Sequence, residues 1–552
     1  MQTPQRTEGA SSPNAGSFWK GWPYAAGIAL LFPVLRHLLT GHVGLNLMDE
    51  GFLWYGVVQT AAGDVPLRDF QAYDPGRYYW GALGAWLFGT GIVDLRLSVA
   101  LFQALGLFCG VLVARRTTQN PWVLFCIAGL LAFWMFPRHK IFESSLAMMA
   151  TWFAVRLLEE PGARRYLVSG IFAGVAAVFG RNHGLYAACA LLLLIVLLHW
   201  KQAQQGIVRA LRLYASGIVI GYAPILILLL VMPEFSERFF ESIRFVIERG
   251  NLPESIPWPW TLDFARTPGF LLGFEISISV LYLLLVSVPP LVLVLYCFSG
   301  AELRSRGQAL VACASVALFY THHALARAGP DHLAQAVHPL LLALVTLPAT
   351  LPALRRQAAI AISLLLAAMV AVSAAIHPDL QHHLRPSPRL VPDDAAGETV
   401  LIPEPQRKAL TDLEQIVRAR IRPEEPLFIA PFDVGLYPLL GRRSPTWELY
   451  MLWSATEAQE RRMHEQLTAG RVDWVLMAMT EISGHPGTYF PDSHPRIWQH
   501  LQNHFVAVEW PRGGIPFPRA PRAGDSAQHS FLPDGSFLAR RAATAPAVRR
   551  QR

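Results

Sequence analysis

Long apolar runs recur along the first two thirds of the chain. Runs such as ALLLLIVLLHW and YASGIVIGYAPILILLLVM belong to apolar stretches of roughly 20 residues, the length that a helix needs to cross a bilayer. We therefore expect an all-α polytopic membrane domain of about eleven transmembrane helices over residues 21–377. Their approximate ranges are 21–40, 80–114, 119–137, 142–158, 166–180, 184–200, 213–232, 270–298, 308–321, 334–354 and 357–376.

The composition agrees with a membrane protein. Of the 552 residues, 53% are hydrophobic and only 16% are charged, and the mean hydropathy is +0.32. This is too apolar for a soluble globular protein, so we expect the lipid bilayer as a partner. The net charge of +8 does not point to nucleic acid, because Lys and Arg accumulate in the cytoplasmic loops of membrane proteins. The five cysteines lie in apolar segments and imply neither disulfides nor a thiol-based metal site.

The basic residues predict an orientation. If residues 1–20 form a cytoplasmic tail, the positive-inside rule is satisfied in one cytoplasmic loop after another. The residues concerned are Lys20, Arg115, Arg116, Arg164, Arg165, Lys201, Arg209, Arg212, Arg304, Arg306, Arg355 and Arg356. With an odd number of spans, the chain after about residue 378 then lies outside the cytoplasm.

A second group of polar residues gathers at the opposite, outer helix ends. Single charges at such positions are commonly anchors at the membrane surface, but several loops on one face indicate a functional site. The residues are Asp49 and Glu50; Arg138, His139, Lys140 and Glu143; Arg181, Asn182 and His183; and His322, His323, Arg327, Asp331 and His332.

Two further outer regions are expected. The segment 233–268 begins with aromatic and aliphatic residues at helical spacing, which predicts an amphipathic helix lying on the membrane. Residues 378–397 are rich in Pro, His and Asp and are typical of a linker. Residues 398–552 then predict a small soluble α/β domain with a disordered tail, because the strand-like runs PLFIAP, VDWVLMA, HFVAVEW and SFLARR alternate with helical stretches.

The first outer loop, residues 41–80, is the most specific part of the sequence, and we call it the Asp49 loop. From Asn46 to Arg96 the chain shows an acidic pair, then VPLRDF, YDPGRYY and a closing DLR. This pattern resembles the first extracytoplasmic loop of GT-C fold glycosyltransferases, in particular bacterial relatives of protein O-mannosyltransferases and aminoarabinose transferases. The motifs RHKIFE at 138–143 and RNHGLY at 181–186 also resemble positions where that superfamily holds basic residues.

The resemblance implies a site and a reaction. In that superfamily the acidic residue after the first transmembrane helix is catalytic, and the donor is a sugar on a polyprenyl phosphate. For this chain it implies an inverting glycosyltransferase of the bacterial inner membrane with Asp49 as base, and we expect partial desolvation to raise the pKa of Asp49. Glu50 points elsewhere on the helix and is expected to hold an Arg, a metal or the acceptor. Asp69 is the main rival to Asp49, or its partner.

The departing phosphate calls for positive charge. Lys140 and Arg181 are the first candidates, followed by Arg138 and Arg327, because guanidinium groups bind phosphate oxygens in pairs and Lys adds a point charge. The remaining candidates are histidines: His139 and His183 for phosphate or sugar, and His322, His323 and His332 as ligands of a possible divalent metal. No spacing among them matches a closed zinc site.

Two other classes of function compete with glycosyl transfer. A transporter or flippase of a lipid-linked or charged solute is one, although such proteins tend to carry internal repeats and polar residues at mid-membrane, which this chain lacks. A non-catalytic envelope assembly protein, binding a partner through residues 398–552, is the other. For a glycosyltransferase, the acceptor is a glycan, a lipid or a protein, and the sequence does not decide among them.

Overall fold

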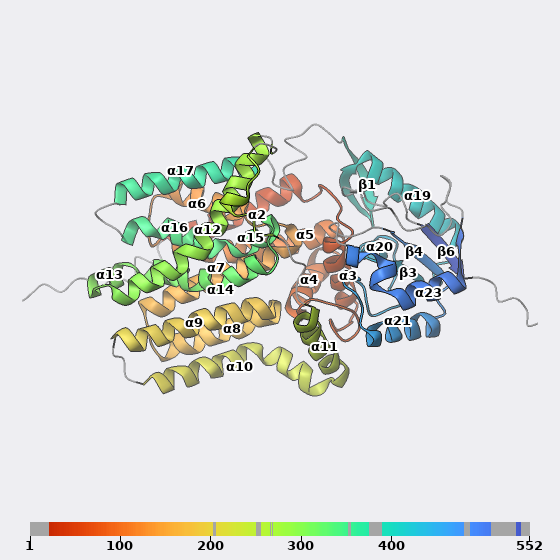
Figure 1. The fold of residues 1–552 in the computed structure, drawn as a ribbon, viewed down its shortest axis with the longest axis horizontal. Helices are drawn as coiled ribbons and strands as arrows, with labels where there is room; N and C mark the ends of the chain where they lie inside the picture. Colours follow the sequence, from red (N-terminus) through yellow and green to blue (C-terminus); the bar gives the residue numbers. More distant parts are fainter. Residues whose placement is uncertain are drawn as a thin grey trace, which may run out of the picture.

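The computed structural model describes residues 21–202, 206–249, 255–264, 267, 269–350, 355–374, 389–479, 486–508 and 537–541. A bundle of helices occupies one half of the molecule, and two small β-sheets with their helices occupy the other (Figure 1). Three helices lie between these halves: α3 (Asp49–Ala61), α4 (Pro75–Phe88) and α11 (Pro233–Arg249).

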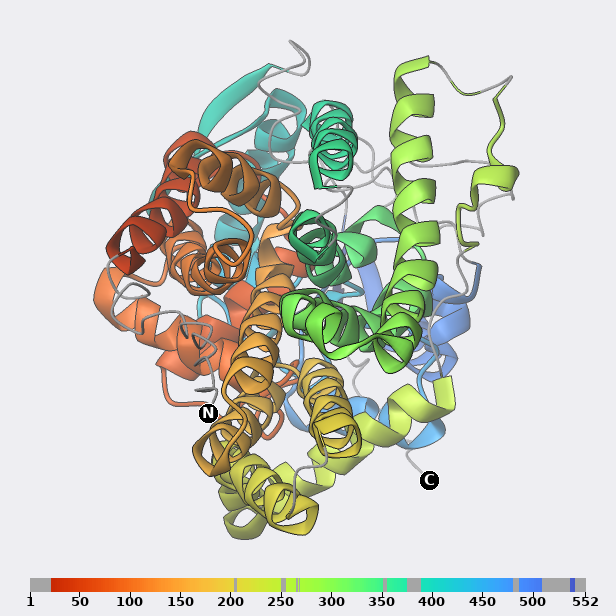
Figure 2. The same cartoon turned by 90° about the vertical axis from the view of Figure 1, so that its left-hand side faces the viewer.

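The bundle is built from long apolar helices, seen largely end-on in Figure 2, with α12 inclined to the others. Its elements are α2 (Trp22–Thr40), α5 (Ile92–Ala114), α6 (Pro121–Phe133), η1 (Arg138–Lys140), α7 (Ile141–Glu159), α8 (Ala163–Phe179), α9 (Arg181–Gln202), α10 (Ile207–Val231), η2 (Pro259–Thr261), α12 (Gly269–Phe298), α13 (Ala301–Arg306), α14 (Gln308–Ala326), α15 (Pro330–Ala336), α16 (His338–Thr350) and α17 (Arg355–Ala374).

Among the described residues, seven helices are long and apolar enough to cross a membrane, and the number is eight if α15 and α16, bent by 54°, form one broken span. The seven are α2, α5, α7 with η1, α9, α10, α12 and α14. The three remaining predicted spans fall on α6, α8 and α17, which are also helices but lie outside this group. Within the described residues, each predicted span therefore contains a helix, although 80–114 holds the end of α4 and all of α5, and 334–354 is divided between α15 and α16.

Small residues bring two of the helices into close contact. A Cβ placed on Gly170 of α8 would lie 3.0 Å from the Cα of Gly217 and 2.1 Å from the carbonyl oxygen of Tyr214 on α10. Without a side chain at these positions the two backbones touch, as is common where helices associate in lipid.

Helix α11 confirms the predicted helix at the start of 233–268, but only part of its apolar surface is available to a membrane. Phe235 and Phe239 are buried and pack with Leu67 and Ile225. Phe240 remains exposed. The expectation of a helix simply lying on the membrane was therefore wrong for the Phe235 face, which packs on the protein.

The residues from 389 onward, which we call the C-terminal unit, contain two sheets. Strands β1 (Leu390–Ala395) and β2 (Glu398–Pro403) form an antiparallel hairpin, so the linker expected over 378–397 ends before Leu390. Residues 378–388 of the expected linker, like the expected tail 1–20 and residues 542–552, lie outside the described residues.

The second sheet has the order β3-β4-β6-β5, with β3 and β4 parallel and the other pairs antiparallel. Its strands are β3 (Leu427–Ala430), β4 (Trp474–Met477), β5 (Phe505–Val508) and β6 (Phe537–Arg541). The helices are α19 (Glu404–Arg420), α20 (Leu436–Leu439), α21 (Glu457–Ala469), η4 (Pro486–Thr488), α22 (Phe490–Ser493) and α23 (Pro495–His504). The four runs predicted as strands are confirmed, since they are the strands of this sheet.

The C-terminal unit packs directly on the Asp49 loop. The backbone N–H of Gly435 donates to the carbonyl oxygen of Leu47 at 2.7 Å. A Cβ on Gly51 would lie 2.6 Å from the Cα of Gly435, so the first turn of α3 and the loop after β3 meet backbone to backbone. This contact places the start of α3 at the junction of the two halves.

Candidate active site

Asp49 is the first residue of α3. The side chain of Asn46 precedes it and accepts hydrogen bonds from the backbone N–H groups of Met48 and Asp49, both at 3.0 Å. The helix therefore starts at a fixed residue, with two acidic side chains, Asp49 and Glu50, in its first turn. The positive end of the helix dipole favours negative charge at this position.

The two oxygens of Asp49 have different surroundings. Oδ1 accepts a hydrogen bond of 2.6 Å from the hydroxyl of Tyr450, whereas Oδ2 lies 4.0 Å from Nε2 of His139, beyond hydrogen-bond distance. The Asp49 side chain is 38% exposed, so the carboxylate is open on one side. An acceptor hydroxyl can approach it there.

The electrostatic environment keeps Asp49 charged. Burial opposes the ionised form, but the nearby His139, the hydrogen bond from Tyr450 and the cations Lys140 and Arg327 outweigh it and hold the pKa of Asp49 below its usual value. The sequence-based expectation of a raised pKa was wrong. Desolvation is present as expected, but cationic groups from distant parts of the chain gather around the carboxylate.

Glu50 faces away from this opening and is buried. It forms a two-pronged ion pair with Arg96 of α5, with distances of 2.9 Å from Nε to Oε1 and 2.6 Å from Nη2 to Oε2. The same guanidinium donates to the carbonyl oxygens of Gly41 and Gly44, just beyond α2. Of the alternatives predicted for Glu50, the structure has it holding an Arg, and the pair ties α3 to α5 and to the end of α2.

Asp69 has a different set of partners from Asp49. Both of its oxygens accept from the guanidinium of Arg68, at 2.8 and 2.7 Å, and Oδ2 also accepts from the backbone N–H of Val65 at 2.7 Å. Although burial opposes ionisation, these hydrogen bonds lower the pKa of Asp69. The arrangement closes a turn of the Asp49 loop, and the structure does not bring the two acids into contact.

Two of the predicted phosphate-binding cations lie near Asp49. Lys140, the last residue of η1, places its Nζ 3.8 Å from the ring centroid of Tyr73 in the Asp49 loop. Arg327 follows α14, and both cations are close enough to Asp49 to stabilise its negative charge. This side of the site therefore combines a carboxylate with two positive charges.

The other two predicted cations have structural partners. Arg138 lines a pocket at the C-terminal end of α2 and donates to the carbonyl oxygens of Thr40 and Val43 at 3.0 and 2.8 Å. Arg181 forms an ion pair of 2.6 Å with Asp74 and donates to the hydroxyl of Ser242 on α11 at 2.9 Å. These contacts favour a role in holding the Asp49 loop and α11 in place over direct phosphate binding.

Behind Lys140 lies a cluster of buried aromatic and polar side chains. His183 of α9 is buried, and its ring centroid lies 5.0 Å from that of His323 and 5.4 Å from that of Tyr320. Nearby, Glu143 forms a buried ion pair of 3.1 Å with Arg77 at the start of α4. The predicted residue His183 is therefore a buried member of this cluster.

The three histidines predicted as metal ligands do not converge. His322 is exposed and hydrogen-bonded to Tyr186 at 2.8 Å, and His323 contacts Gln335 at 3.0 Å. The rings of His323 and His332 are 5.6 Å apart. Within the part of the chain that the structure describes, no group of three or more His, Cys, Asp or Glu side chains is arranged to hold a metal ion.

The residue that sequence reasoning missed is Tyr450, which lies 401 positions from Asp49 along the chain. A chain of aromatic contacts lies beside Asp49, with ring centroids 5.0 to 5.6 Å apart. Its rings, in order, are Tyr73, Phe52, Tyr450 and Phe432. No local pattern around WELY marks this tyrosine, because its role depends on how the C-terminal unit packs.

Comparison with known proteins adds information on the fold. Neither a family model nor a curated protein matches the sequence. Among solved structures, ArnT from Cupriavidus metallidurans bound to undecaprenyl phosphate is similar over 95% of this chain and 98% of that chain, with 14% sequence identity and a TM-score of 0.50. The same ArnT in the apo state, at 15% identity, gives a TM-score of 0.44. The archaeal oligosaccharyltransferase AglB from Archaeoglobus fulgidus has 11% sequence identity and a TM-score of 0.41, and the match covers 96% of this chain and 77% of that chain.

The fold and the apolar helices together define an integral membrane protein with the GT-C fold. We base this on the ArnT complex with undecaprenyl phosphate, which the match covers over 98% of its length. The expected resemblance to the GT-C fold is thereby confirmed. A shared fold does not by itself assign a reaction, which depends on the residues of the site.

Proposed function

We propose that this protein is an inverting glycosyltransferase that moves a sugar from a polyprenyl-phosphate donor to an acceptor on the extracytoplasmic side of the membrane. One observation carries the proposal: Asp49 is an ionised, partly open carboxylate with Lys140 and Arg327 within electrostatic reach. The fold supports a lipid-phosphate donor, since the similar ArnT structure was solved with undecaprenyl phosphate.

The reaction is a single displacement at the anomeric carbon. The acceptor oxygen forms the new glycosidic bond while the bond from the anomeric carbon to the phosphate oxygen breaks, and its electron pair leaves with the phosphate. The acceptor proton passes to Oδ2 of Asp49 as general base. Lys140 and Arg327 stabilise the charge that grows on the departing phosphate. The acceptor hydroxyl belongs to a glycan, a lipid or a protein.

For the arrangement in the membrane we propose eleven spans, a cytoplasmic N-terminus and an extracytoplasmic C-terminal α/β domain, in a bacterial inner membrane. The basic residues Arg304 and Arg306 support this orientation, since α13 lies at the end of the bundle far from the C-terminal unit (Figure 1). The Asp49 loop lies at the other end, against that unit.

An assay of transfer tests the activity. Membranes containing the overproduced chain are incubated with radiolabelled sugars on polyprenyl phosphates, next to membranes without it, and the label is followed into lipid, glycan and protein fractions. We expect label to move to one fraction with inversion at the anomeric carbon. Movement of the intact donor across the bilayer without any transfer would instead support the transporter hypothesis.

A further inference from the structure

A short segment of the C-terminal unit, residues 446–450, packs on the Asp49 loop. The indole N–H of Trp447 donates to the carbonyl oxygen of Leu67 at 2.9 Å, and the backbone N–H of Gln71 donates to the carbonyl oxygen of Trp447 at 2.8 Å. The side-chain oxygen of Gln71 accepts from the backbone N–H groups of both Leu449 and Tyr450, each at 2.8 Å. The backbone that carries Tyr450 is thus fixed to the Asp49 loop.

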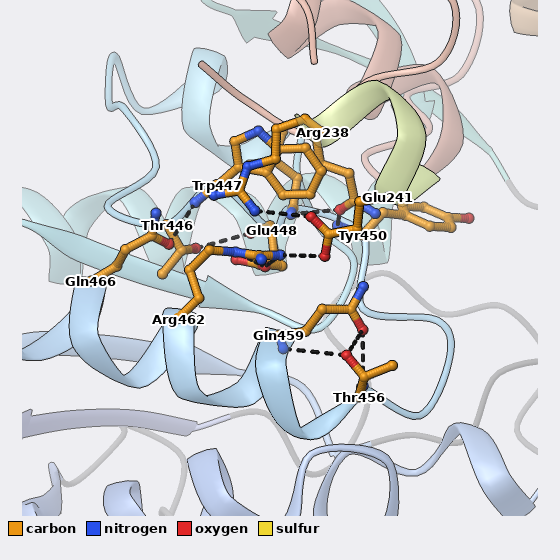
Figure 3. A network of polar contacts seen from close by, with 12 residues as sticks. Arg238, Glu241, Thr446, Trp447, Glu448, Tyr450, Thr456, Gln459, Arg462 and Gln466 are labelled. Atoms are coloured by element: carbon orange, nitrogen blue, oxygen red, sulfur yellow. Dashed lines mark hydrogen bonds and ion pairs between the residues drawn. The ribbon is translucent and has the colours of Figure 1, made fainter. Parts of the chain in front are cut away.

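A charged network secures the same segment from the other side (Figure 3). Arg462 of α21 pairs with Glu448 at 2.6 Å and with Glu241 of α11 at 3.1 Å. The guanidinium of Arg238, also on α11, lies 5.0 Å from the centroid of a Trp447 ring. The Asp49 loop, α11 and the C-terminal unit itself therefore all hold residues 446–450.

The Tyr450 ring is packed as firmly as its backbone. Its centroid lies 5.4 Å from that of Phe52 and 5.6 Å from that of Phe432, in tilted and edge-to-face contacts. Its hydroxyl then has a defined position and donates to Oδ1 of Asp49 at 2.6 Å. A short bond from a held phenol to a carboxylate restricts how that carboxylate can rotate.

We propose that Tyr450 is a positioning residue for Asp49, through which the C-terminal unit takes part in the transfer reaction. The phenol fixes Oδ1 and thereby directs Oδ2 toward the acceptor hydroxyl. This inference rests on the proposed function. It also assigns a role to the network of Arg238, Glu241, Glu448 and Arg462. These residues hold residues 446–450 in place, so that Tyr450 stays within hydrogen-bond distance of Asp49 at the start of α3.

The groups facing Asp49 make the role of Tyr450 measurable. His139 and Lys140 approach from η1 and Arg327 from the end of α14, while the neighbouring Glu50 is neutralised by Arg96. Tyr450 differs from these because removing its hydroxyl changes no formal charge. Loss of a hydrogen bond to the charged form raises the pKa of a carboxylate, so the acidic limb of the rate profile moves to higher pH.

The test compares Tyr450→Phe with Tyr55→Phe across pH in the transfer assay. Tyr55 is the matched control, because its hydroxyl accepts from the backbone N–H of Ser444 in the same interface and not from Asp49. For Tyr450→Phe we expect the midpoint of the acidic limb to move to a higher pH by about one unit. We also expect kcat to fall by about tenfold, with KM for the donor unchanged. Tyr55→Phe should keep the wild-type limb.

The inference is overturned if Tyr450→Phe keeps the wild-type acidic limb, or if Tyr55→Phe shifts it equally. Asp49→Asn is included as a reference. If that variant transfers sugar at the wild-type rate, the proposed function fails, whatever Tyr450 does. If Asp49→Asn is inactive and Tyr450→Phe behaves like the wild type, only the inference about Tyr450 fails.

Discussion

Glu50 and Arg96 form a buried ion pair at the junction of α3 and α5, with 4% of each residue exposed. Removing one partner of such a pair leaves an unbalanced charge inside the protein. We expect Glu50→Gln to destabilise the detergent-solubilised protein by about 3 kcal/mol or more, measured as a fall in the thermal unfolding midpoint.

The control for this variant is Glu160→Gln. The Glu160 side chain is 57% exposed and pairs with Arg156 and Arg165 at the surface, so its loss should cost about 1 kcal/mol at most. An unchanged midpoint for Glu50→Gln together with lost transfer would make Glu50 a participant in the reaction and contradict its structural role.

The elements of the fold and the contacts of Asp49 differ in how far the sequence predicts them. The helices and the strands such as Leu427–Ala430 were predictable, because hydrophobic periodicity is local. Asp49 was singled out by the motif that surrounds it, and its role as the base stays a proposal. Its partner Tyr450 was not, because the contact spans 401 positions and no pattern in the sequence encodes it.

The pKa of Asp49 shows the same limit. Desolvation follows from a position at a helix end, but the opposing cations come from η1 and from the chain after α14, and their distances to Asp49 exist only in the folded protein. Arg138 and Lys140 illustrate this further. They are two residues apart in one motif. Arg138 donates to backbone carbonyl oxygens, whereas Lys140 faces Tyr73 near Asp49.

That contrast gives a second prediction. Lys140→Ala should reduce kcat/KM for the donor by about a hundredfold, because a positive charge near the leaving phosphate is lost. Lys140→Arg should recover part of this rate. Arg138→Ala should mainly lower the thermal midpoint, because it frees the carbonyl oxygens of Thr40 and Val43. Equal kinetic losses for Lys140→Ala and Arg138→Ala at full stability would contradict the assignment.

A third prediction concerns orientation. Arg418→Cys, on a side chain that is 80% exposed in the C-terminal unit, should react with a membrane-impermeant maleimide in intact spheroplasts. Arg164→Cys, at the exposed start of α8, should react only after the membrane is opened. The protein without an added cysteine is treated in parallel, to measure any labelling of its native cysteines. Labelling of both positions from the same side would overturn the proposed topology.

A fourth prediction concerns the network that links α11 to the C-terminal unit. Arg462→Ala leaves Glu448, whose side chain is 9% exposed, without its partner, so α11 and residues 446–450 should loosen. We expect faster limited proteolysis near α11 and slower sugar transfer. Arg461→Ala is the control, because that side chain is 61% exposed and its contact with Glu457 is 3.8 Å. Equal proteolysis of the two variants would count against the network.

The most direct test of the central claim compares Asp49→Asn with Asp69→Asn in the transfer assay, at matched amounts of membrane-inserted protein. Asn keeps the shape of each side chain but removes its charge and its ability to accept a proton. Our account predicts that Asp49→Asn loses about a hundredfold or more in kcat, whereas Asp69→Asn, altered in a turn of the loop, retains most of it. Wild-type transfer by Asp49→Asn, or the larger loss in Asp69→Asn, would contradict the assignment of Asp49 as the base.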